Sequence, residues 1–477
     1  MSRKNKVKPV LENVRIEAVA AEGNALAHVD GKVLFVPAMV PGDVVDVQLT
    51  RSRKGYMEGY VTRLVSPSPD RIEPVCGHFG DCGGCKWQCL PYSLQLKAKQ
   101  QQVEDQLRRI GHLQLPEISP IIGSDRQYYY RNKLEFTFSN HRWILKGEDP
   151  NSLSPEEFVG LGFHISGFFD KVLDLKHCHL QGAPSNEIRN FIRSYALRKG
   201  LSFFNLREQT GFLRNLVLRT ASTGEVMLTV VFGPDAAAER ETVLEVLGDI
   251  YKEFPQITSL NYVINNKKND TIGDLEIENY AGRDCIYEQM EGLRFKIGPK
   301  SFYQTNSEQA YRLYSVVRDF ARRDFADKIP VIYDLYTGTG TIALFLSSMA
   351  GKVVGIEYVP EAIEDAWENA RLNGIDNSSF YAGDMKDVLN DEFIKNNGHP
   401  DLVVLDPPRA GIHPDVAEVL LRTAPKHMIY VSCNPASQAR DLAVFASKYD
   451  ITAIQPVDMF PQTHHVENVV ALSLRDE

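Results

Sequence analysis

The sequence lacks any long hydrophobic run. Its 477 residues are 43% hydrophobic and 24% charged, which is ordinary for a globular protein, and no apolar stretch is long enough for a transmembrane helix. The basic N-terminus, residues 1–6, leads into no apolar segment typical of a signal peptide. We therefore expect a cytoplasmic protein without a membrane partner, whose seven cysteines are reduced, metal-bound or catalytic rather than paired in disulfides.

An overall excess of positive charge is also lacking. The net charge is -9, which argues against bulk binding of nucleic acid through charge alone. Residues 1–66 differ from the rest, because their basic side chains outnumber their acidic ones. Internal repeats and low-complexity tracts are absent as well, so the length predicts a few ordinary domains.

Short alternating segments characterise the N-terminal domain, which we place at residues 1–66. Apolar and polar residues alternate in 14–19, 32–36, 44–49 and 60–65, and glycine or proline separates these segments. This period of two predicts β-strands. A small five-stranded β-barrel of the OB type is the natural way to close them.

A cysteine-rich loop follows the linker at residues 66–69. Cys76, Cys82 and Cys85 stand among glycines that allow a tight backbone, so their sulfurs can converge on one point. This spacing predicts a metal or iron–sulfur site, and a set of thiolate ligands suits zinc as well as iron and sulfide. Spacing alone leaves the fourth ligand open between Cys89 and the distant Cys178.

Residues 67–300 combine helix and strand patterns, which predicts an α+β central domain. An amphipathic pattern over residues 92–110 ends at Gly111 and predicts a helix that packs on the catalytic domain. In residues 128–133, aromatic rings alternate with positive charges. That composition suits stacking on unpaired bases and contact with phosphates, although a solvated edge strand would look the same.

Strand and helix patterns alternate from residue 301 to 477. The buried strand at 331–335 breaks into a turn with Gly338 and Gly340, and a second strand ends at Glu357 about 20 residues later. This order predicts a Rossmann-like nucleotide-binding domain, in which Glu357 accepts hydrogen bonds from ribose hydroxyls. Two glycines preceded by Asp334 favour S-adenosylmethionine over a dinucleotide, which wants a third glycine.

Three further residues follow predicted strands of this domain. Asp384 follows the third strand, Asp406 precedes two prolines after the fourth, and Cys433 follows the apolar segment 428–431. Ligands of open α/β sheets gather at the carboxyl ends of the strands. Cys433 is therefore a candidate nucleophile, although a lone cysteine is as often a small buried apolar residue.

The segments 406–411, 432–435 and 465–469 resemble the RumA/TrmA-type RNA uracil-C5 methyltransferases. The resemblance covers nearly the whole chain and includes an N-terminal TRAM domain, an OB-like RNA-binding module. It implies a class I methyltransferase domain at 301–477, which uses S-adenosylmethionine. The RumA-like branch of the family implies a [4Fe–4S] cluster, and Cys89 departs from the histidine expected at its position.

The resemblance also assigns roles to individual residues. Cys433 matches the nucleophile that adds to carbon 6 of uracil, and Glu467 matches the base that removes the proton from carbon 5. The implied cluster ligands are Cys76, Cys82, Cys85 and Cys178. The cofactor contacts are Gln304, Tyr336, Thr341, Glu357, Asp384 and Asp406.

The cluster loop and barrel resemble the members that act on ribosomal RNA, so we expect a monomer that methylates a single-stranded or loop uridine of 23S ribosomal RNA. One alternative is a transfer-RNA uridine-C5 methyltransferase. A cytosine-C5 methyltransferase ranks lower, because such enzymes carry a cysteine in the segment that here reads Asp406-Pro407-Pro408-Arg409. Two other classes are an RNA-binding chaperone with an inactive transferase domain and a metal-dependent redox protein.

Overall fold

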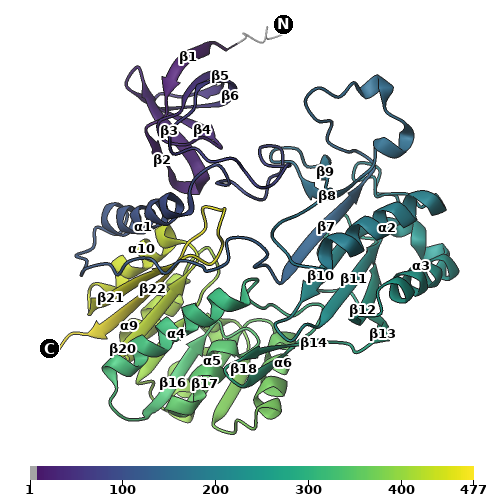
Figure 1. Ribbon diagram of the computed structural model, residues 1–477. Coiled ribbons are helices and arrows are strands. Elements are labelled where there is room, and N and C mark those ends of the chain that lie inside the picture. Colours follow the sequence, from purple (N-terminus) through teal and green to yellow (C-terminus); the bar gives the residue numbers. More distant parts are fainter. Residues whose placement is uncertain (1–7, 477) are drawn as a thin grey trace, which may run out of the picture.

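The computed structural model describes residues 8–476, and the predicted basic N-terminal segment lies outside them. The chain forms three large sheets and one hairpin (Figure 1). The N-terminal barrel lies at the top, the central sheet at the right, and the sheet of residues 329–474 at the lower left. No helix in this part of the chain is both long and apolar enough to cross a membrane.

The N-terminal barrel has six strands, so the predicted number of five is wrong. The strand order is β1-β5-β6-β4-β3-β2, and buried side chains alternate with outward ones along β3 and β4. Strand β3 lies outside the four alternating segments that the sequence showed, so it was missed. The strands are β1 (Val10–Arg15), β2 (Ala18–Val19), β3 (Asn24–Val29), β4 (Lys32–Pro37), β5 (Val44–Ser52) and β6 (Tyr56–Ser66).

Helix α1 (Tyr92–Arg109) connects the cysteine loop to the central sheet and packs against α10 (Pro435–Phe445) of the C-terminal part. A fully buried ion pair is a second contact between α1 and the C-terminal part, because Lys99 Nζ lies 2.5 Å from Asp458 Oδ1. The Tyr92 hydroxyl donates to the other carboxylate oxygen of Asp458 at 2.7 Å. Breaking such a buried pair by removing one partner costs about 3–5 kcal/mol, so α1 is held firmly to the C-terminal part.

The central sheet has the order β13-β12-β11-β10-β7-β8-β9, and α2 and α3 pack with it around one apolar core. Strand β11 coincides with the mostly apolar segment 226–232, in which apolar and polar residues do not alternate and all residues are buried. The strands are β7 (Lys133–Ser139), β8 (Gly160–His164), β9 (Val172–Asp174), β10 (Leu213–Thr220), β11 (Val226–Phe232), β12 (Ile257–Ile264) and β13 (Glu278–Gly282). The helices are α2 (Ser185–Lys199) and α3 (Arg240–Glu253).

The C-terminal sheet has the order β18-β17-β16-β19-β20-β22-β21. The first five of these strands are parallel, and β22 runs antiparallel to both of its neighbours. The hairpin β14 (Ile286–Met290) and β15 (Leu293–Ile297) precedes it. The strands are β16 (Ile329–Leu335), β17 (Ala350–Glu357), β18 (Ser378–Ala382), β19 (Leu402–Leu405), β20 (His427–Ser432), β21 (Tyr449–Val457) and β22 (Glu467–Leu474).

Helices cover both faces of this sheet, as in a doubly wound α/β domain. Helix α4 is capped by Asn306, whose side chain accepts from the Gln309 backbone N–H. The helices are α4 (Ser307–Asp324), α5 (Thr341–Leu346), α6 (Pro360–Leu372), α7 (Met385–Val388), α8 (Asp391–Asn397), α9 (Pro414–Thr423) and α10 (Pro435–Phe445).

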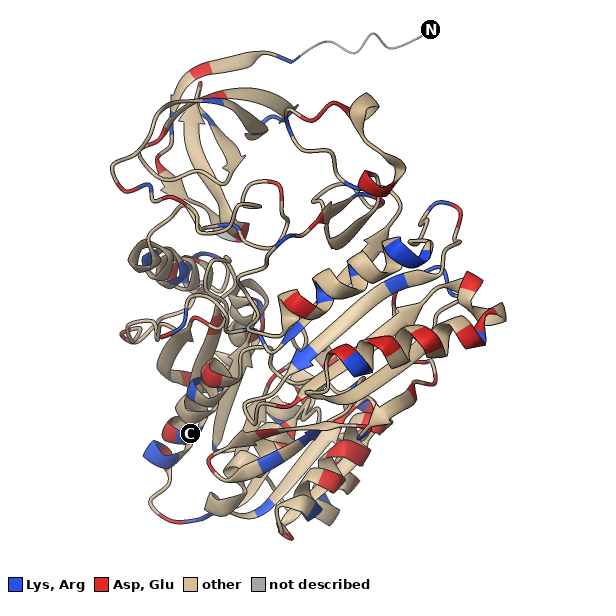
Figure 2. Cartoon of the chain, turned by 45° about the vertical axis from the view of Figure 1, so that its right-hand side comes forward, with Lys and Arg blue, Asp and Glu red and all other residues tan. Residues whose placement is uncertain are grey.

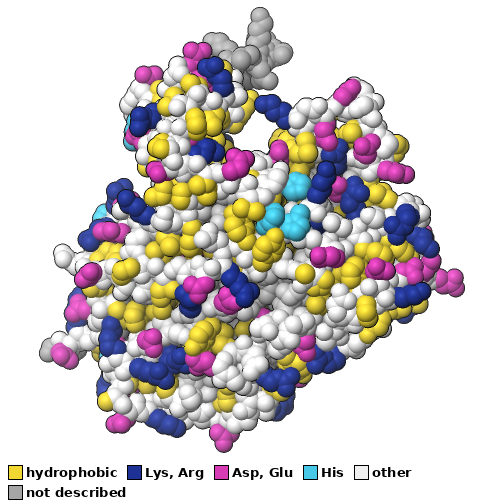
Figure 3. All heavy atoms as spheres, in the orientation of Figure 1, with side chains coloured by type: hydrophobic (Ala, Val, Ile, Leu, Met, Phe, Trp, Pro, Cys, Tyr) yellow, Lys and Arg dark blue, Asp and Glu magenta, His cyan; other side chains and the backbone are white. Residues whose placement is uncertain are grey.

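Acidic side chains recur along α3 and α6 (Figure 2). Lys and Arg are interspersed with Asp and Glu on the face seen in Figure 3. The net negative charge therefore does not form one uniform surface that would repel a polyanion everywhere.

Candidate active site

Three predicted site residues, Glu357, Asp406 and Cys433, lie together with Asp334 at one edge of the C-terminal sheet. Asp334 is the penultimate residue of β16, Glu357 ends β17, Asp406 follows β19, and Cys433 follows β20. These strands are parallel, so their carboxyl ends meet on the same side. This edge is where ligands bind in open α/β sheets.

The antiparallel pairing of β20 with β22 brings Cys433 next to Glu467. Ser432 is paired with Asn468, and one step further along the same register lie Cys433 and Glu467. Glu467 is only 5% exposed, whereas Cys433 is half-buried and lines an open cavity. A thiol and a carboxyl group that are 34 positions apart in the sequence thus become neighbours.

The carboxyl groups of this edge raise one another's pKa. Burial, followed by the negative charge of Asp406, raises the pKa of Glu467 to about 8. Burial and Asp334 raise the pKa of Asp406 to about 7. Burial raises the pKa of Asp334 to about 7, although its carboxylate accepts hydrogen bonds from Thr337 Oγ1 at 2.5 Å and Ala343 N at 3.0 Å. A cationic ligand would relieve this crowding of acids.

The Cys433 thiol has an unfavourable environment for ionisation. Burial, then the charges of Glu467 and Asp406, raise its pKa to about 11, and the positive charge of Arg409 acts in the opposite direction. The Arg409 carbonyl accepts a hydrogen bond from Asn434 Nδ2 at 3.1 Å, which ties the two loops together. Sequence reasoning missed Arg409, although it stands in the same segment as Asp406.

The turn after β16 has the close backbone approach that a nucleotide site requires. Tyr336 has a φ of 67°, which bulky residues rarely adopt, and such strain is typical of functional sites. The Glu357 carboxylate accepts from Gly338 N and Val359 N, both at 3.1 Å. Glu357 is thereby held beside the glycine turn, and its role as a ribose-binding acid stays a prediction.

The other predicted cofactor contacts are more dispersed. Thr341 is buried at the start of α5, with its hydroxyl 3.3 Å from that of Thr339. Gln304 lies in the loop before α4, and its carbonyl accepts from Asn132 Nδ2 at 2.8 Å. Asp384 caps α7 and forms an ion pair with Lys386 at 3.1 Å.

Tyr336 and Asp384 line a cavity of about 760 Å³ at the end of the sheet. Tyr358 and Met385 line the same cavity, and Tyr358 is 68% exposed. Sequence reasoning missed both, although Tyr358 directly follows Glu357 and an exposed aromatic ring at a strand end is a signal for ligand stacking. The cavity volume suits a nucleoside-sized ligand.

Two buried polar atoms near this edge have no hydrogen-bond partner in the described part of the chain. They are Asp334 Oδ1 and the hydroxyl of Tyr303, the residue before Gln304. Buried polar groups are nearly always satisfied, and unpaired ones at a site indicate a missing ligand. The residues present therefore fit S-adenosylmethionine, a cation that also offers amino and hydroxyl donors.

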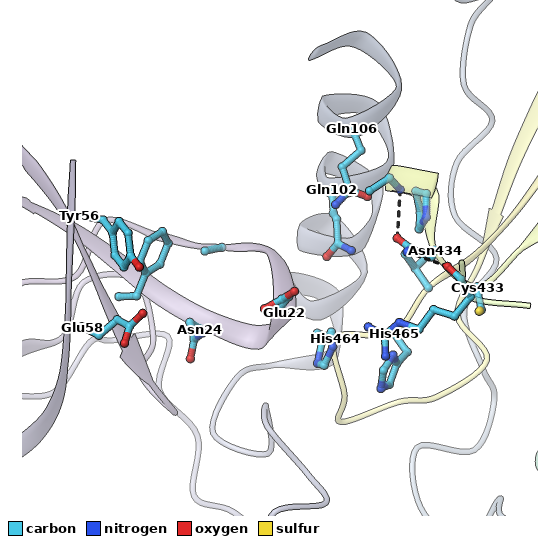
Figure 4. Close-up of a pocket in the computed structure, with 16 residues that line it drawn as sticks. Glu22, Asn24, Tyr56, Glu58, Gln102, Gln106, Cys433, Asn434, His464 and His465 are labelled. Carbon is cyan, nitrogen blue, oxygen red and sulfur yellow. Dashed lines mark hydrogen bonds between the residues drawn. The ribbon is translucent and has the colours of Figure 1, made fainter. Parts of the chain in front are cut away.

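Cys433 opens into a second cavity of about 760 Å³, which we call the barrel cleft (Figure 4). His464 and His465 line it beside Cys433, and Figure 4 shows Tyr56 and Glu58 on the opposite side. Burial, together with neighbouring positive groups including Arg409, lowers the pKa of both histidines to about 4, so their imidazoles are neutral. The barrel cleft therefore connects the candidate nucleophile with the N-terminal barrel.

The four predicted cluster ligands line one small cavity of about 20 Å³. Burial raises the pKa of Cys82 to about 11 and that of Cys85 to about 12, and the nearby cysteines add to both shifts. The rest of the lining is mixed: it includes apolar side chains such as those of Phe163 and Leu175, and also Gln88, His177 and His179. Within residues 8–476, however, no three His, Cys, Asp or Glu side chains are placed as ligands of a single metal ion.

Cys89 lies apart from these four cysteines. It is 1% exposed in a separate apolar cluster with Val40, Trp87 and Leu90, and its sulfur lies 3.6 Å from the carbonyl oxygen of Ala38. Of the two residues that the spacing left open, Cys178 is therefore the one that shares a cavity with the other three.

Two protein-family models match the chain. Residues 267–475 match the tRNA (uracil-5-)-methyltransferase family, and residues 12–62 match the TRAM domain. The second match agrees with the OB-like barrel predicted from the sequence. The first covers the whole C-terminal sheet and the hairpin before it.

Relatives match over almost the full length. An RNA methyltransferase of Bacteroides thetaiotaomicron is 56% identical, over 96% of this chain and 100% of that protein. One of Porphyromonas gingivalis is 55% identical, over 96% and 99%. The crystal structure of Pyrococcus abyssi tRNA (uracil-54, C5)-methyltransferase with S-adenosyl-L-homocysteine is 28% identical, with a TM-score of 0.73 over 97% of this chain and 100% of that one. The chain therefore belongs to the tRNA (uracil-5-)-methyltransferase family of S-adenosylmethionine-dependent RNA uracil-C5 methyltransferases.

Proposed function

We propose that this protein is a cytoplasmic monomer that methylates carbon 5 of one uridine in 23S ribosomal RNA. Cys433 is the nucleophile and Glu467 is the base. The observation that carries the proposal is the register of β20 and β22, which makes these two side chains neighbours at the ligand-binding edge of the sheet. The same edge carries Glu357 and Asp406, which we assign to the cofactor together with Gln304, Tyr336, Thr341 and Asp384.

The chemistry requires both side chains because carbon 5 of uracil is a poor nucleophile. Addition of the Cys433 thiolate to carbon 6 forms a carbon–sulfur bond and moves an electron pair into the ring, where carbon 5 becomes nucleophilic. S-adenosylmethionine supplies the electrophilic methyl group when it is bound. Glu467 then removes the proton from carbon 5, and the electron pair that is left behind expels the thiolate of Cys433.

The charges of the site determine whether Cys433 and Glu467 are protonated. With a pKa near 11, Cys433 is almost fully protonated at neutral pH, so the Arg409 charge and a bound cation must favour its thiolate. Glu467, with a pKa near 8, is mostly protonated before the reaction and must be ionised when the carbon-5 proton leaves. Binding of a cation beside Asp406 and Glu467 promotes both ionisations.

The target base has to leave its stack to reach Cys433 through the barrel cleft. Extruding a base costs a few kcal/mol in a duplex and less in a single strand. A loop or single-stranded uridine is therefore the favoured substrate. Arg409 is the one arginine or lysine among the described residues that line the barrel cleft, and it suits a phosphate next to the target base.

The barrel and the cysteine loop support ribosomal RNA, because the sequence resembles the ribosomal-RNA members in these two features. A specific observation favours a second candidate, transfer RNA: the Pyrococcus abyssi protein is a tRNA (uracil-54, C5)-methyltransferase and matches this chain over almost its entire length.

Mass spectrometry of 5-methyluridine in separated RNA classes from a gene-deletion strain distinguishes the two targets. We expect the modification to be lost at one position of 23S ribosomal RNA and restored by the wild-type gene but not by Cys433→Ala. Loss from transfer RNA alone would support the second candidate. Unchanged 5-methyluridine in both classes would contradict the proposed activity.

We also propose a [4Fe–4S] cluster held by Cys76, Cys82, Cys85 and Cys178. Their shared cavity and apolar surroundings support it, and a cluster needs its four thiolates further apart than a single metal ion does. Bound there, the cluster would cross-link the cysteine loop to the central domain. Anaerobically purified protein should be brown and contain about four iron atoms per chain; a colourless protein with zinc would contradict the cluster.

A further inference from the structure

The barrel side of the barrel cleft has a distinct chemical character. We call this surface the barrel wall; it consists of Ala20, Glu22, Asn24, Phe35, Tyr56 and Glu58. Alternation in β4 and β6 turns Phe35, Tyr56 and Glu58 outward, while Leu34, Val36 and Met57 fill the barrel core.

Two aromatic rings form the centre of the barrel wall. The ring centroids of Phe35 and Tyr56 lie 6.4 Å apart at an interplanar angle of 62°. Parallel pairing of β4 with β6 sets Phe35 directly beside Glu58. Both rings are half-buried, so each keeps an accessible surface on which the face of a nucleobase could stack.

The charge of the barrel wall disfavours phosphate and suits the edge of a base. Within the described residues, its members include two carboxylates, Glu22 and Glu58, and neither lysine nor arginine. Arg51, which is not part of the lining, pairs with Glu58 Oε1 at 3.4 Å. The carboxylate has a second oxygen that can accept a hydrogen bond from an exocyclic amino group, as Glu does from cytosine N4.

The barrel cleft also has room for more than the target uracil. Its volume of about 760 Å³ is in the range of sites for drug-sized ligands, which are larger than one pyrimidine ring. Two side chains that line it, Gln106 and His464, each have a buried polar atom without a partner among the described residues. Unsatisfied groups around a cavity of this size point to a larger polar ligand.

We propose that the barrel wall binds a second unpaired base of the same RNA molecule while the target uracil lies at Cys433. This base stacks on Phe35 and Tyr56, and Glu58 recognises its amino group. Adenine, cytosine and guanine have such a group and uracil does not, so the site discriminates against uracil at one position near the target. The inference rests on the proposed function, because the target must react at Cys433.

The test uses a pool of short single-stranded RNAs with one 5-fluorouridine flanked by random nucleotides, incubated with S-adenosylmethionine. After methyl transfer, carbon 5 has no proton for Glu467 to remove, so the bond between Cys433 and carbon 6 persists. The trapped RNA is then sequenced. Wild-type protein should enrich amino-bearing bases over uracil by about tenfold at one flanking position.

Variants then separate stacking from recognition. Tyr56→Ala should lower the adduct yield at subsaturating RNA by about tenfold, whereas Tyr56→Phe should retain it. Glu58→Gln should still form adducts but lose most of the enrichment. Tyr60→Ala is the matched control, because Tyr60 lies on the same strand, is 52% exposed and is not part of the barrel wall. Binding of S-adenosylhomocysteine shows that each variant is folded.

Two results would overturn this inference while leaving the proposed function intact. One is a wild-type adduct with no base enrichment at any flanking position. The other is a Tyr56→Ala yield equal to that of wild type and Tyr60→Ala. If the wild-type protein traps no RNA at all, both the thiolate mechanism and this inference are wrong.

Discussion

The site of Cys433 and the four-cysteine cavity share the burial of their thiols, but they differ in access and in the groups that surround the sulfur atoms. In both regions burial raises the pKa of thiols, to about 11 for Cys433 and for Cys82. Cys433 opens into a cavity of about 760 Å³, beside two acids and Arg409. Cys82 faces a cavity of about 20 Å³, among other thiols, apolar side chains and two histidines. A perturbed thiol pKa therefore does not identify a nucleophile; the neighbouring groups and the access do.

The largest expected effect comes from removing the Cys433 thiol. Cys433→Ala should lower kcat for RNA methylation by at least about 1,000-fold, because nothing else in the site activates carbon 5. Calorimetric binding of S-adenosylhomocysteine should stay within about twofold, since the thiol is needed only for the chemical step. Cys285→Ala is the control, because Cys285 is buried outside both regions. Normal turnover by Cys433→Ala would mean that Cys433 is not the nucleophile, and the distinction between a catalytic cysteine and the four-cysteine cavity would be wrong.

A smaller effect should follow from neutralising Arg409. Its charge lowers the pKa of Cys433, and a nearby opposite charge shifts a pKa by about 1–3 units. Arg409→Gln should therefore slow methylation by about 10- to 100-fold at neutral pH, and Arg409→Lys should recover part of the loss.

The pH dependence of Cys433 alkylation by iodoacetamide checks this cause. The profile should move to higher pH in Arg409→Gln, with Cys285→Ala as a background control. If Arg409→Gln slowed turnover without moving the profile, Arg409 would serve RNA binding alone.

Cys178→Ala and Cys89→Ala compare the two cysteines between which sequence spacing could not decide. Cys178→Ala should lose most of its iron and its visible absorbance, because Cys178 shares the cavity of Cys76, Cys82 and Cys85. Cys89→Ala should keep both, and its cost should be that of a small cavity in an apolar cluster, about 1–2 kcal/mol. Iron loss in Cys89→Ala but not in Cys178→Ala would reverse the assignment.

The smallest effect concerns stability and pH. Folding raises the pKa of Glu467 from 4.5 to about 8, so the folded state holds a proton that the unfolded state has released between these values. The stabilising contribution of this group is therefore complete below about pH 4.5 and is lost as pH rises toward 8.

The free energy of unfolding in urea should be lower at pH 8.5 than at pH 5. This decrease should be roughly 2–4 kcal/mol smaller in Glu467→Gln than in wild type. Asp334 and Asp406 contribute in the same direction in both proteins, which leaves the comparison valid. Equal pH dependence of the two proteins would mean that folding does not raise the pKa of Glu467.

Much of the catalytic part could be predicted from the sequence, because short segments determine it. The strand before Gly338, the acid Glu357 and the Asp406 segment are local signals, and the structure places all three at one edge. The domain limits at residues 66 and 300 stay predictions.

The barrel cleft could not be predicted, because it depends on long-range packing. Tyr56 and His464 line the same cavity although they are 408 positions apart in the sequence. Strand β3 was missed because Asn24 follows a glycine and its alternating residues are mostly small, which weakens the strand pattern.

The central claim is that Cys433 holds the uracil while Glu467 releases the product. It is tested most directly by incubating Glu467→Gln with unmodified RNA and S-adenosylmethionine and sequencing the cross-linked peptide by mass spectrometry. We predict an adduct on Cys433 that contains a uridine with one added methyl group, and no adduct with Cys433→Ala combined with Glu467→Gln. An adduct on another residue, or normal release of 5-methyluridine by Glu467→Gln, would contradict the claim.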